Sequence, residues 1–442
     1  MVATLALAAA GTAAGAEPVA LHNARVLDGT GAAARSAHTV VVVDGKIAAV
    51  GPDGTVAVPA GARRIDLAGK TLMPGLISDH SHLGMTDGAT SGPQNYNRDN
   101  IERQLRQFQR YGVTTVTSLG LNGPLFQDLR ARARAGNGVG ADVFGADRGI
   151  GVPEGAPRMN VAPEQLYRPS TAEQARAAVR EMAARQPDLV KIWVDDFNRT
   201  LAHKMSPEVY IAAIDEAHRH GLRVAAHVYY LDDARKLVAA GADILAHGVR
   251  DLPVDDALVD AMKQRGTSYV STLDLDEAFF IYAQRPAWMA SPFFRNALQP
   301  ALATQFDDAG WREKTLADAG KRKTWEDGLK NNQANLKRMV DAGVRVGFGT
   351  DSGATPLRIP GFAEHRELEL AVEAGLTPLQ AVRMATSQAA ALLGLDDRGV
   401  IAPGKRADLL VIAGEPDRDI LHTRNIQAVW QAGREVAGPV VQ

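Results

Sequence analysis

The chain has 442 residues, and its 49 lysines and arginines nearly balance its 51 aspartates and glutamates. This near-neutral balance gives no reason to expect nucleic acid or an anionic membrane as a partner, and no block of like charge suggests an interaction tail. The sequence contains no cysteine, which excludes disulfides, thiol catalysis, iron–sulfur clusters and cysteine zinc sites. Any metal bound here must be held by nitrogen and oxygen ligands.

The first sixteen residues are apolar and rich in alanine, and they end in Ala14-Gly15-Ala16, a small-x-small pattern typical of signal-peptidase sites. The segment is shorter than the roughly 20 residues of a transmembrane helix. It lacks the early lysine or arginine of most signal peptides, and a disordered alanine-rich tail is the alternative. We expect residues 1–16 to be a signal peptide of a periplasmic or secreted protein, or part of a cytoplasmic one if they are not. No other segment indicates membrane insertion.

Short β-branched runs and turn residues fill both ends of the chain. The expected strands are 39–43, 47–50, 408–412 and 426–431, the last forming a hairpin with 434–436. Because this pattern is confined to the two ends, we expect residues 17–72 and 401–442 to form one small β-sandwich domain around everything between them.

Residues 73–400 alternate between short apolar runs and amphipathic helical stretches. The expected strands are 113–119, 189–194, 223–226, 244–246 and 344–348, and the expected helices include 171–185, 206–220 and 231–240. In the second of these helices, a period of 3.6 puts Val209, Ile211, Ala212 and Ile214 on the apolar face. Strand–helix alternation implies parallel strands with crossover helices. The length favours an α/β fold of the (β/α)8 TIM-barrel type, whose active residues sit at the C-terminal ends of strands.

One stretch, about 274–337, breaks this alternation. It holds three of the five tryptophans and five of the eleven phenylalanines, mixed with many charges. Two interpretations stay open: a pair of helices that packs on the barrel, or a cap over the active-site mouth that supplies an apolar substrate wall.

The expected strand ends carry side chains suited to metal chemistry. In chain order they are His80, His82, Lys191, His227, His247 and Asp351. His80 and His82 are two residues apart in an extended segment, so both can reach one metal ion. Lys191 lies inside an apolar run, where desolvation lowers the pKa of its amine. Each feature alone is weak, but their joint order across one alternating domain indicates a metal centre.

These motifs resemble the amidohydrolase superfamily of metal-dependent hydrolases over nearly the full length of the chain. Residues 73–77, just before the two histidines, are similar to the first-strand signature of the superfamily, and residues 402–409 to its return into the sheet domain. The sequence is most similar to the imidazolonepropionase-like and Xaa-Pro dipeptidase-like group. That group includes amidases acting on N-acyl amino acids.

The resemblance implies two divalent ions, zinc with manganese or cobalt as substitutes, bridged by a CO2-derived carbamate on Lys191. It also implies hydrolysis by a metal-bridging hydroxide, with Asp351 as general base and then acid. The implied ligands are His80, His82 and Asp351 for the first ion, His227 and His247 for the second, and Lys191 as the bridge.

The chain departs from the family pattern at two places. Members usually have aspartate two residues before the first histidine, where this chain has Ser78 followed by Asp79. The support of His80 is therefore expected to differ, while its role as a ligand is unaffected. Mononuclear deaminases of the superfamily usually carry glutamate three residues after the strand-five histidine, but His227 is followed by Val-Tyr-Tyr. That absence, together with Lys191, favours the binuclear branch.

Three residues are candidates for binding substrate. Tyr229 and Tyr230 directly follow a ligand and can hydrogen-bond a carboxylate or oxyanion, although core tyrosines are an equal alternative. Arg148, in the glycine-rich loop 145–155, is a candidate carboxylate clamp, with a surface cation as the alternative. The loop carries no nucleotide-binding pattern.

The leading functional hypothesis is an amidohydrolase that cleaves C–N bonds of small amides such as dipeptides or N-acyl amino acids. The same site is also suited to a lactonase, esterase or phosphotriesterase, because metal chemistry does not dictate the scissile bond. A third alternative, a catalytically inactive scaffold, conflicts with the complete ligand set. The expected partner is a small-molecule amide, not nucleic acid, and a homo-oligomer is compatible with the sequence.

Overall fold

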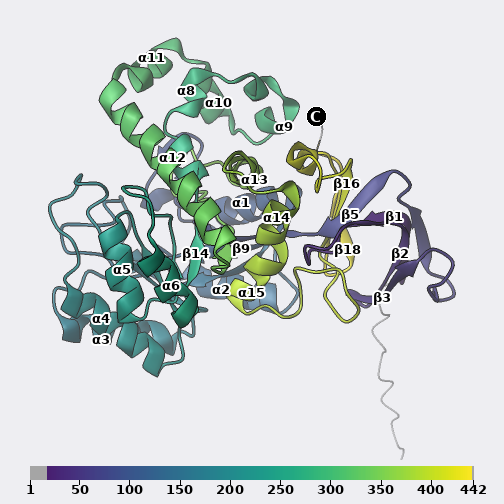
Figure 1. Cartoon of the computed structure of the whole chain (residues 1–442), viewed down its shortest axis with the longest axis horizontal. Coiled ribbons are helices and arrows are strands. Elements are labelled where there is room, and N and C mark those ends of the chain that lie inside the picture. The colour runs from purple at the N-terminus through teal and green to yellow at the C-terminus, as the bar shows by residue number, and fades with distance from the viewer. Residues whose placement is uncertain (1–16, 441–442) are drawn as a thin grey trace, which may run out of the picture.

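The computed structural model describes residues 17–440, so the expected signal peptide lies outside the described residues. Figure 1 shows a larger body of strands and helices, with a smaller all-β part beside it that contains both the first and the last strands. Within the described residues, no helix combines the length and apolar character needed to cross a bilayer.

Both ends of the chain contribute to one sheet. Its strands are β1 (Val19–Val26), β2 (Arg35–Val43), β3 (Lys46–Pro52), β4 (Arg63–Asp66), β5 (Lys70–Pro74), β16 (Leu409–Ala413), β17 (Ile426–Gln431) and β18 (Arg434–Ala437). The two ends meet where β5 runs antiparallel to β16, with Leu72 opposite Val411. Apolar side chains of both ends, among them Leu21, Val42 and Trp430, form one buried cluster. Strands from both ends of the chain therefore share one sheet and one buried cluster.

Eight parallel strands run through the larger body. They are β6 (Leu76–Ser81), β9 (Val113–Leu119), β10 (Asp142–Ala146), β11 (Val190–Trp193), β12 (Val224–His227), β13 (Ile244–Leu245), β14 (Ser268–Val270) and β15 (Val346–Gly347). They form two sheets, one of β10, β9 and β6 and one running from β11 to β15. Isolated parallel bridges join the sheets on both sides, Ala146 to Leu189 and Ser81 to Ser352. The carboxyl ends of all eight strands therefore point the same way.

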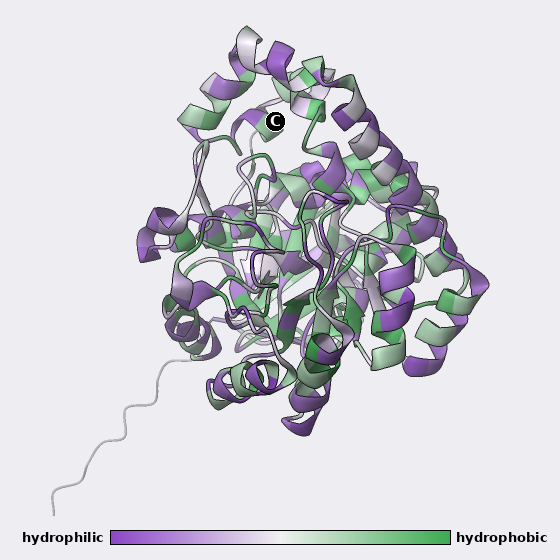
Figure 2. Ribbon diagram, turned by 90° about the vertical axis from the view of Figure 1, so that its left-hand side faces the viewer, coloured by the Kyte–Doolittle hydropathy of each residue, from purple (hydrophilic) through white to green (hydrophobic). Residues whose placement is uncertain are grey.

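Helices follow most of these strands. They are α1 (Arg98–Arg110), α2 (Leu125–Arg134), α3 (Ala172–Ala184), α4 (Pro207–Arg219), α5 (Leu231–Ala240), α6 (Asp256–Arg265), α13 (Phe362–Glu373), α14 (Pro378–Arg383) and α15 (Ala389–Leu393). In Figure 2 the green, apolar segments gather toward the middle of the body, and purple turns face outward. In α4, Val209, Ala212 and Ile214 are buried as expected, but Ile211 is 40% exposed. Placing Ile211 on the apolar face was wrong, because that face turns toward Tyr210 and Ala213 instead.

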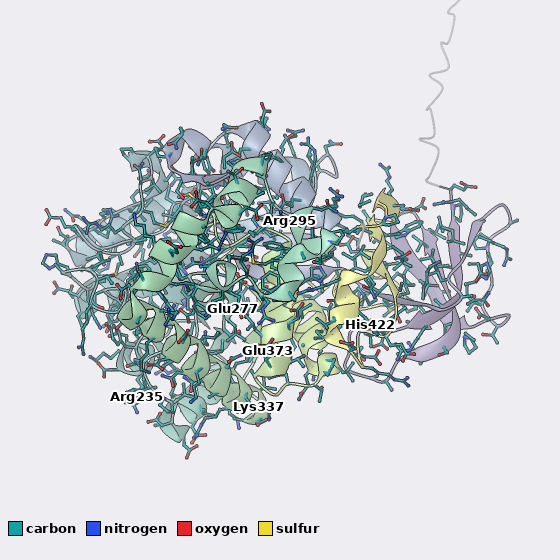
Figure 3. The ribbon with its side chains drawn as sticks, turned by 90° about the horizontal axis from the view of Figure 1, so that it is seen from above. Arg235, Glu277, Arg295, Lys337, Glu373 and His422 are labelled. Carbon is teal, nitrogen blue, oxygen red and sulfur yellow. The ribbon has the colours of Figure 1, made fainter. Side chains whose placement is uncertain are left out.

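The aromatic-rich stretch folds as several short helices and one long one. They are α7 (Asp274–Glu277), α8 (Ile281–Gln284), α9 (Pro292–Arg295), α10 (Pro300–Asp307), α11 (Ala309–Ala317) and α12 (Ala319–Asp341). Its aromatic rings pack on one another and on α13, where Phe294 meets Phe362 with ring centroids 4.8 Å apart. Arg366 of α13 also donates to Glu277, at the end of α7, and to Glu373. Figure 3 labels these two glutamates. This stretch is therefore anchored to the body by an aromatic cluster and by ion pairs.

Candidate metal centre

The six side chains singled out from the sequence converge at the carboxyl ends of the parallel strands. His80 lies near the end of β6, His227 ends β12, and His247 and Asp351 follow β13 and β15 by two and four residues. Lys191 is the second residue of β11 and so lies inside the strand, two residues before its carboxyl end, whereas the sequence analysis expected it at the strand end. All six are at most 6% exposed.

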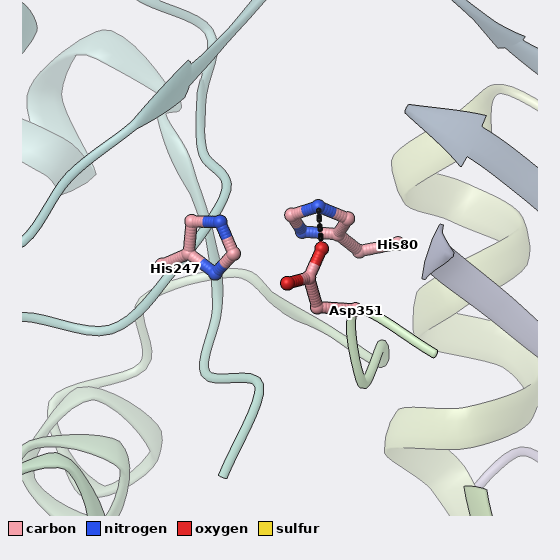
Figure 4. Close-up of side chains that lie close together, drawn as sticks. All are labelled: His80, His247 and Asp351. Carbon is pink, nitrogen blue, oxygen red and sulfur yellow. Dashed lines mark ion pairs between the residues drawn. The ribbon is translucent and has the colours of Figure 1, made fainter. Parts of the chain in front are cut away.

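His80, His82 and Asp351 form the first half of the centre. Asp351 Oδ1 lies 3.2 Å from His80 Nε2 and 3.0 Å from His82 Nε2. The other ring nitrogens are held from behind, because His80 Nδ1 is 2.6 Å from the Ala246 carbonyl and His82 Nδ1 is 3.3 Å from the Gly120 carbonyl. Such bonds direct the Nε2 atoms at the shared carboxylate oxygen. Figure 4 shows His80 and Asp351 facing each other beside His247.

The backbone around Asp351 explains how the half-centre is assembled. The N–H groups of Thr350 and Asp351 donate to the His80 carbonyl over 3.1 and 2.9 Å. Gly349 allows this approach, since a Cβ there would lie 2.6 Å from His80 Cβ. Asp351 itself has φ +60, a left-handed conformation that aspartate tolerates better than most residues.

Lys191, His227 and His247 form the second half. The His247 ring lies 4.5 Å from that of His80 and 4.3 Å from that of His227, centroid to centroid, so the two halves are contiguous. His247 Nδ1 is held by the Thr272 hydroxyl at 2.9 Å. Both ring nitrogens of His227 and the Nζ of Lys191 lack a hydrogen-bond partner among the described residues.

Burial sets the protonation of these groups. Burial and the nearby Lys191 lower the pKa of His80 to about 3, and burial lowers the pKa of His247 well below its ordinary value. Burial also lowers the pKa of Lys191 from 10.5 to about 7. Although burial opposes ionisation of Asp351, the Arg358 guanidinium and the His80 ring hold its pKa well below the usual range. The centre thus offers neutral imidazoles, a carboxylate and an amine that is readily uncharged.

This donor set fits a metal site. His80, His247 and Asp351 offer ligand atoms that all lie within 4.8 Å of one another. Buried polar atoms without a hydrogen bond, such as His80 Nε2, Lys191 Nζ and His227 Nε2, are costly unless they bind something. Neutral imidazole and ionised carboxylate are also the forms that metal ions bind. Potential metal binding is therefore built into the described residues.

The departure at Ser78 has a structural counterpart. Glu364 of α13 accepts hydrogen bonds from the hydroxyls of Ser78, Thr350 and Ser352 over 3.3, 2.7 and 2.7 Å. Asp79 instead accepts the Phe348 N–H at 3.0 Å. A glutamate from a distant helix therefore supports the loop that carries Asp351, and the sequence analysis did not find it.

Two buried arginines were also missed. Arg358 forms an ion pair with Asp351 through Oδ2 and lies over the Phe279 ring at 5.1 Å. Arg250 pairs with Asp276 at 3.2 Å and lies 4.7 Å from the Tyr229 ring centre. Each follows a candidate ligand, Arg358 seven residues after Asp351 and Arg250 three residues after His247, and this proximity was the only signal in the sequence.

A cavity of about 410 Å³ opens at this centre. His82, His227, His247 and Asp351 line it, together with apolar side chains from several loops. The aromatic-rich stretch contributes Phe279 and Trp325, whose rings stack 4.2 Å apart. Most rings of that stretch pack against the body, as the first interpretation expects. Phe279 and Trp325 form part of the cavity wall, as the second expects.

The three substrate-binding candidates are not together. Tyr229 lines the cavity. Tyr230 donates its hydroxyl to Asp196 at 2.6 Å and is not among the lining residues. Arg148 lies 3.5 Å from Glu181 and 4.9 Å from the Tyr167 ring centre, also outside the cavity lining. The structure therefore brings only Tyr229 to the centre.

The sequence of the chain matches the model of the amidohydrolase family over residues 71–441. The chain therefore belongs to the amidohydrolase family, whose members are hydrolases acting on C–N bonds.

Individual relatives agree with this family. An imidazolonepropionase of Deinococcus deserti is 43% identical over 104 residues, which cover 23% of this chain and 26% of that protein. A solved candidate prolidase from Bifidobacterium longum superposes with a TM-score of 0.76 at 26% identity, covering 96% of both chains. A Xaa-Pro dipeptidase solved with bound methionine in its active site reaches the same TM-score of 0.76 at 22% identity, covering 96% of this chain and all of that one. The last likeness concerns the fold alone.

Proposed function

We propose that this enzyme holds two divalent ions and cleaves the C–N bond of small amides that carry a free carboxylate, such as dipeptides or N-acyl amino acids. The observation that carries the proposal is the cavity itself. Its floor is formed by metal-type donors, and apart from Asp351 every ionised side chain in its lining is a lysine or an arginine.

The fold supports this arrangement if the eight parallel strands form one closed (β/α)8 barrel, as we infer. The bridges on both sides of the two sheets favour closure. So does a small buried cluster inside the strands, formed by Leu119, Ala146, Leu189, Ala225, Ile244, Ala246, Val270 and Leu392. We further propose residues 73–400 as the barrel domain, and 17–72 with 401–442 as the small β-sandwich.

We divide the residues between the two ions as the resemblance to the family implies. His80, His82 and Asp351 would bind one ion, and His227 and His247 the other. An uncharged Lys191 amine, favoured by its burial, can react with CO2 to give the anionic bridge between them. Nitrogen and oxygen donors of this kind suit Zn²⁺, with Mn²⁺ or Co²⁺ as substitutes. Such a pair of ions supplies an acidified water and a polarised substrate carbonyl.

Asp351 is the group placed to move the proton. As water attacks the carbonyl carbon, the Asp351 carboxylate accepts a proton from the attacking water. It then delivers this proton to the leaving nitrogen when the C–N bond breaks. Arg358 engages Oδ2 and leaves Oδ1 facing the histidines. The guanidinium therefore fixes which oxygen faces the reacting atoms.

The charges of the cavity select the substrate class. Arg250 and Arg358 are each paired with a buried carboxylate. Arg158 and Lys321 also line the cavity, but they are exposed, and their side chains have no hydrogen bond or ion pair among the described residues. Two free cations at the mouth favour a substrate carboxylate. The apolar wall, including Trp193, favours an apolar side chain on the same substrate.

The direct test is a substrate panel on enzyme loaded with zinc. N-acetyl amino acids and dipeptides should be hydrolysed, and the same compounds capped as C-terminal amides should be hydrolysed at least ten times more slowly in kcat/KM. Lactones and phosphotriesters belong in the panel. Faster turnover of either would replace the amidase assignment, and no turnover of any compound by enzyme containing two ions would favour the inactive scaffold.

The role of the free cations has its own variant. A double variant, Arg158→Gln with Lys321→Gln, should raise KM for carboxylate substrates about tenfold, corresponding to about 1.4 kcal/mol, and leave kcat nearly unchanged. Lys323→Gln is the matched control, because Lys323 lies on the same helix but pairs with Asp327 outside the cavity. An equal change in KM in the control would argue against the carboxylate site.

The stacked pair Phe279–Trp325 separates this cavity from a neighbouring one of about 480 Å³, since both rings line both cavities. Trp325→Ala should join the two spaces and shift selectivity toward bulkier acyl groups by about tenfold, the order expected for losing an aromatic contact. Trp311 lines only the neighbouring cavity. If Trp311→Ala shifts selectivity as much as Trp325→Ala does, the pair is not the dividing wall.

A further inference from the structure

Asp195 is a buried carboxylate that the six-ligand set leaves out. It lies two residues beyond the end of β11, four residues after Lys191, and is 0% exposed. Its Oδ1 accepts the Phe197 N–H at 2.9 Å, while its Oδ2 has no hydrogen-bond partner among the described residues. No lysine or arginine of residues 17–440 forms an ion pair with it. A buried carboxylate in this condition is costly unless it binds a cation.

The imidazole of His227 lies beside this carboxylate, with Nε2 3.4 Å from Asp195 Oδ1. This separation is longer than the roughly 2.7–2.9 Å of a charge-assisted hydrogen bond. Both nitrogens of His227 also lack a hydrogen bond. The contact is therefore not an ordinary aspartate–histidine pair.

The separation of His227 Nε2 and Asp195 Oδ1 does match the distance between two ligand atoms of one ion. Donor atoms that each lie about 2.1 Å from a tetrahedral ion are roughly 3.4 Å apart. The same kind of spacing, 3.0 and 3.2 Å, separates Asp351 Oδ1 from the two histidines of the first half. Each half of the centre thus presents a carboxylate oxygen at ligand spacing from an imidazole nitrogen.

We propose that Asp195 is a seventh ligand, bound to the same ion as His227 and His247. The inference rests on the proposed two-ion function and adds a ligand to it. The Phe197 N–H would then hold the ligating carboxylate in place, as backbone donors commonly do for metal-bound carboxylates. An added anionic oxygen ligand also moves the metal preference of the half that contains His227 and His247 from zinc toward manganese or cobalt.

The alternative is that Asp195 only positions His227 by accepting its Nε2–H. A crystal structure of the zinc-loaded wild-type enzyme separates the two roles without any variant. A carboxylate oxygen of Asp195 at about 2.0–2.2 Å from an ion supports the proposal. A distance above 3 Å from both ions would overturn it.

Metal affinity supplies a second measurement. Chelator competition on Asp195→Asn should show one ion held as in the wild type and the other weakened at least tenfold, within the roughly 10–100-fold cost of disturbing a metal shell. Asp196→Asn is the matched control, because Asp196 is the next residue and receives the Tyr230 hydroxyl outside the cavity lining. Unchanged affinity for both ions in folded Asp195→Asn would contradict the assignment.

These measurements do not depend on substrate. If Asp195 binds an ion but no amide is hydrolysed, the proposed function fails and the seventh ligand stands. If amides are hydrolysed and Asp195 lies away from both ions, the ligand assignment fails and the function stands.

Discussion

Replacing Lys191 by methionine should stabilise the metal-free protein while it abolishes activity. Lys191 is 0% exposed, and its Nζ has no hydrogen-bond partner among the described residues. Burial lowers the pKa of the amine from 10.5 to about 7. At about 1.4 kcal/mol per pH unit, that difference of about 3.5 corresponds to about 5 kcal/mol for holding a charged amine in this site. Methionine has a similar volume and no charge, so it removes this cost.

The stability advantage of Lys191→Met over the wild type depends on pH, and this dependence identifies its cause. The unfolded chain keeps its Lys191 proton up to about pH 10.5, whereas the folded metal-free chain releases it near pH 7. Stability of the wild type therefore rises with pH across this window, and the variant lacks that rise. The advantage of Lys191→Met should be largest below pH 7 and should vanish toward pH 10.5.

Thermal unfolding of chelator-treated protein at pH 6.5 and pH 9.5 measures this difference. Lys330→Met is the control, because Lys330 is exposed and its replacement should change stability by no more than about 0.5 kcal/mol at either pH. Activity of Lys191→Met should fall by orders of magnitude after metal loading. A variant less stable than the wild type at pH 6.5, or an advantage that does not shrink with pH, would refute the reasoning.

Metal-free enzyme that is given zinc and bicarbonate should regain activity at a rate that increases as pH rises through about 7, because only the uncharged Lys191 amine attacks CO2. A recovery rate that does not change with pH would contradict this. Gly349→Ala should cost about 1–3 kcal/mol of stability and weaken metal retention by displacing His80. Gly438→Ala, with open space around it, should cost nearly nothing by the same urea titration. We also propose that residues 1–16 are removed on export, so mass spectrometry of protein from its native source should find Glu17 first, and an intact first residue would count against it.

The strands and the candidate ligands near their carboxyl ends were accessible from the sequence because both depend on local patterns. The run 113–119 begins with five β-branched residues and coincides with β9, Val113–Leu119. His227 follows an apolar run and ends β12. Tyr229 and Tyr230 lie side by side, with ring centroids 5.0 Å apart, yet only Tyr229 lines the cavity. The sequence alone did not say which of the two would do so.

The residues that were missed act across large separations in sequence. Glu364 supports the Asp351 loop by accepting from Ser78, 286 residues away in the chain. Asp195 meets His227 only because β11 and β12 are paired in register, with Trp193 beside His227. The carboxylate of Asp195, two residues beyond Trp193, therefore lies beside His227 of the neighbouring strand. Register between parallel strands depends on packing of the whole sheet, which no local pattern encodes. For this reason a seventh ligand becomes visible only when the neighbouring strands are in place.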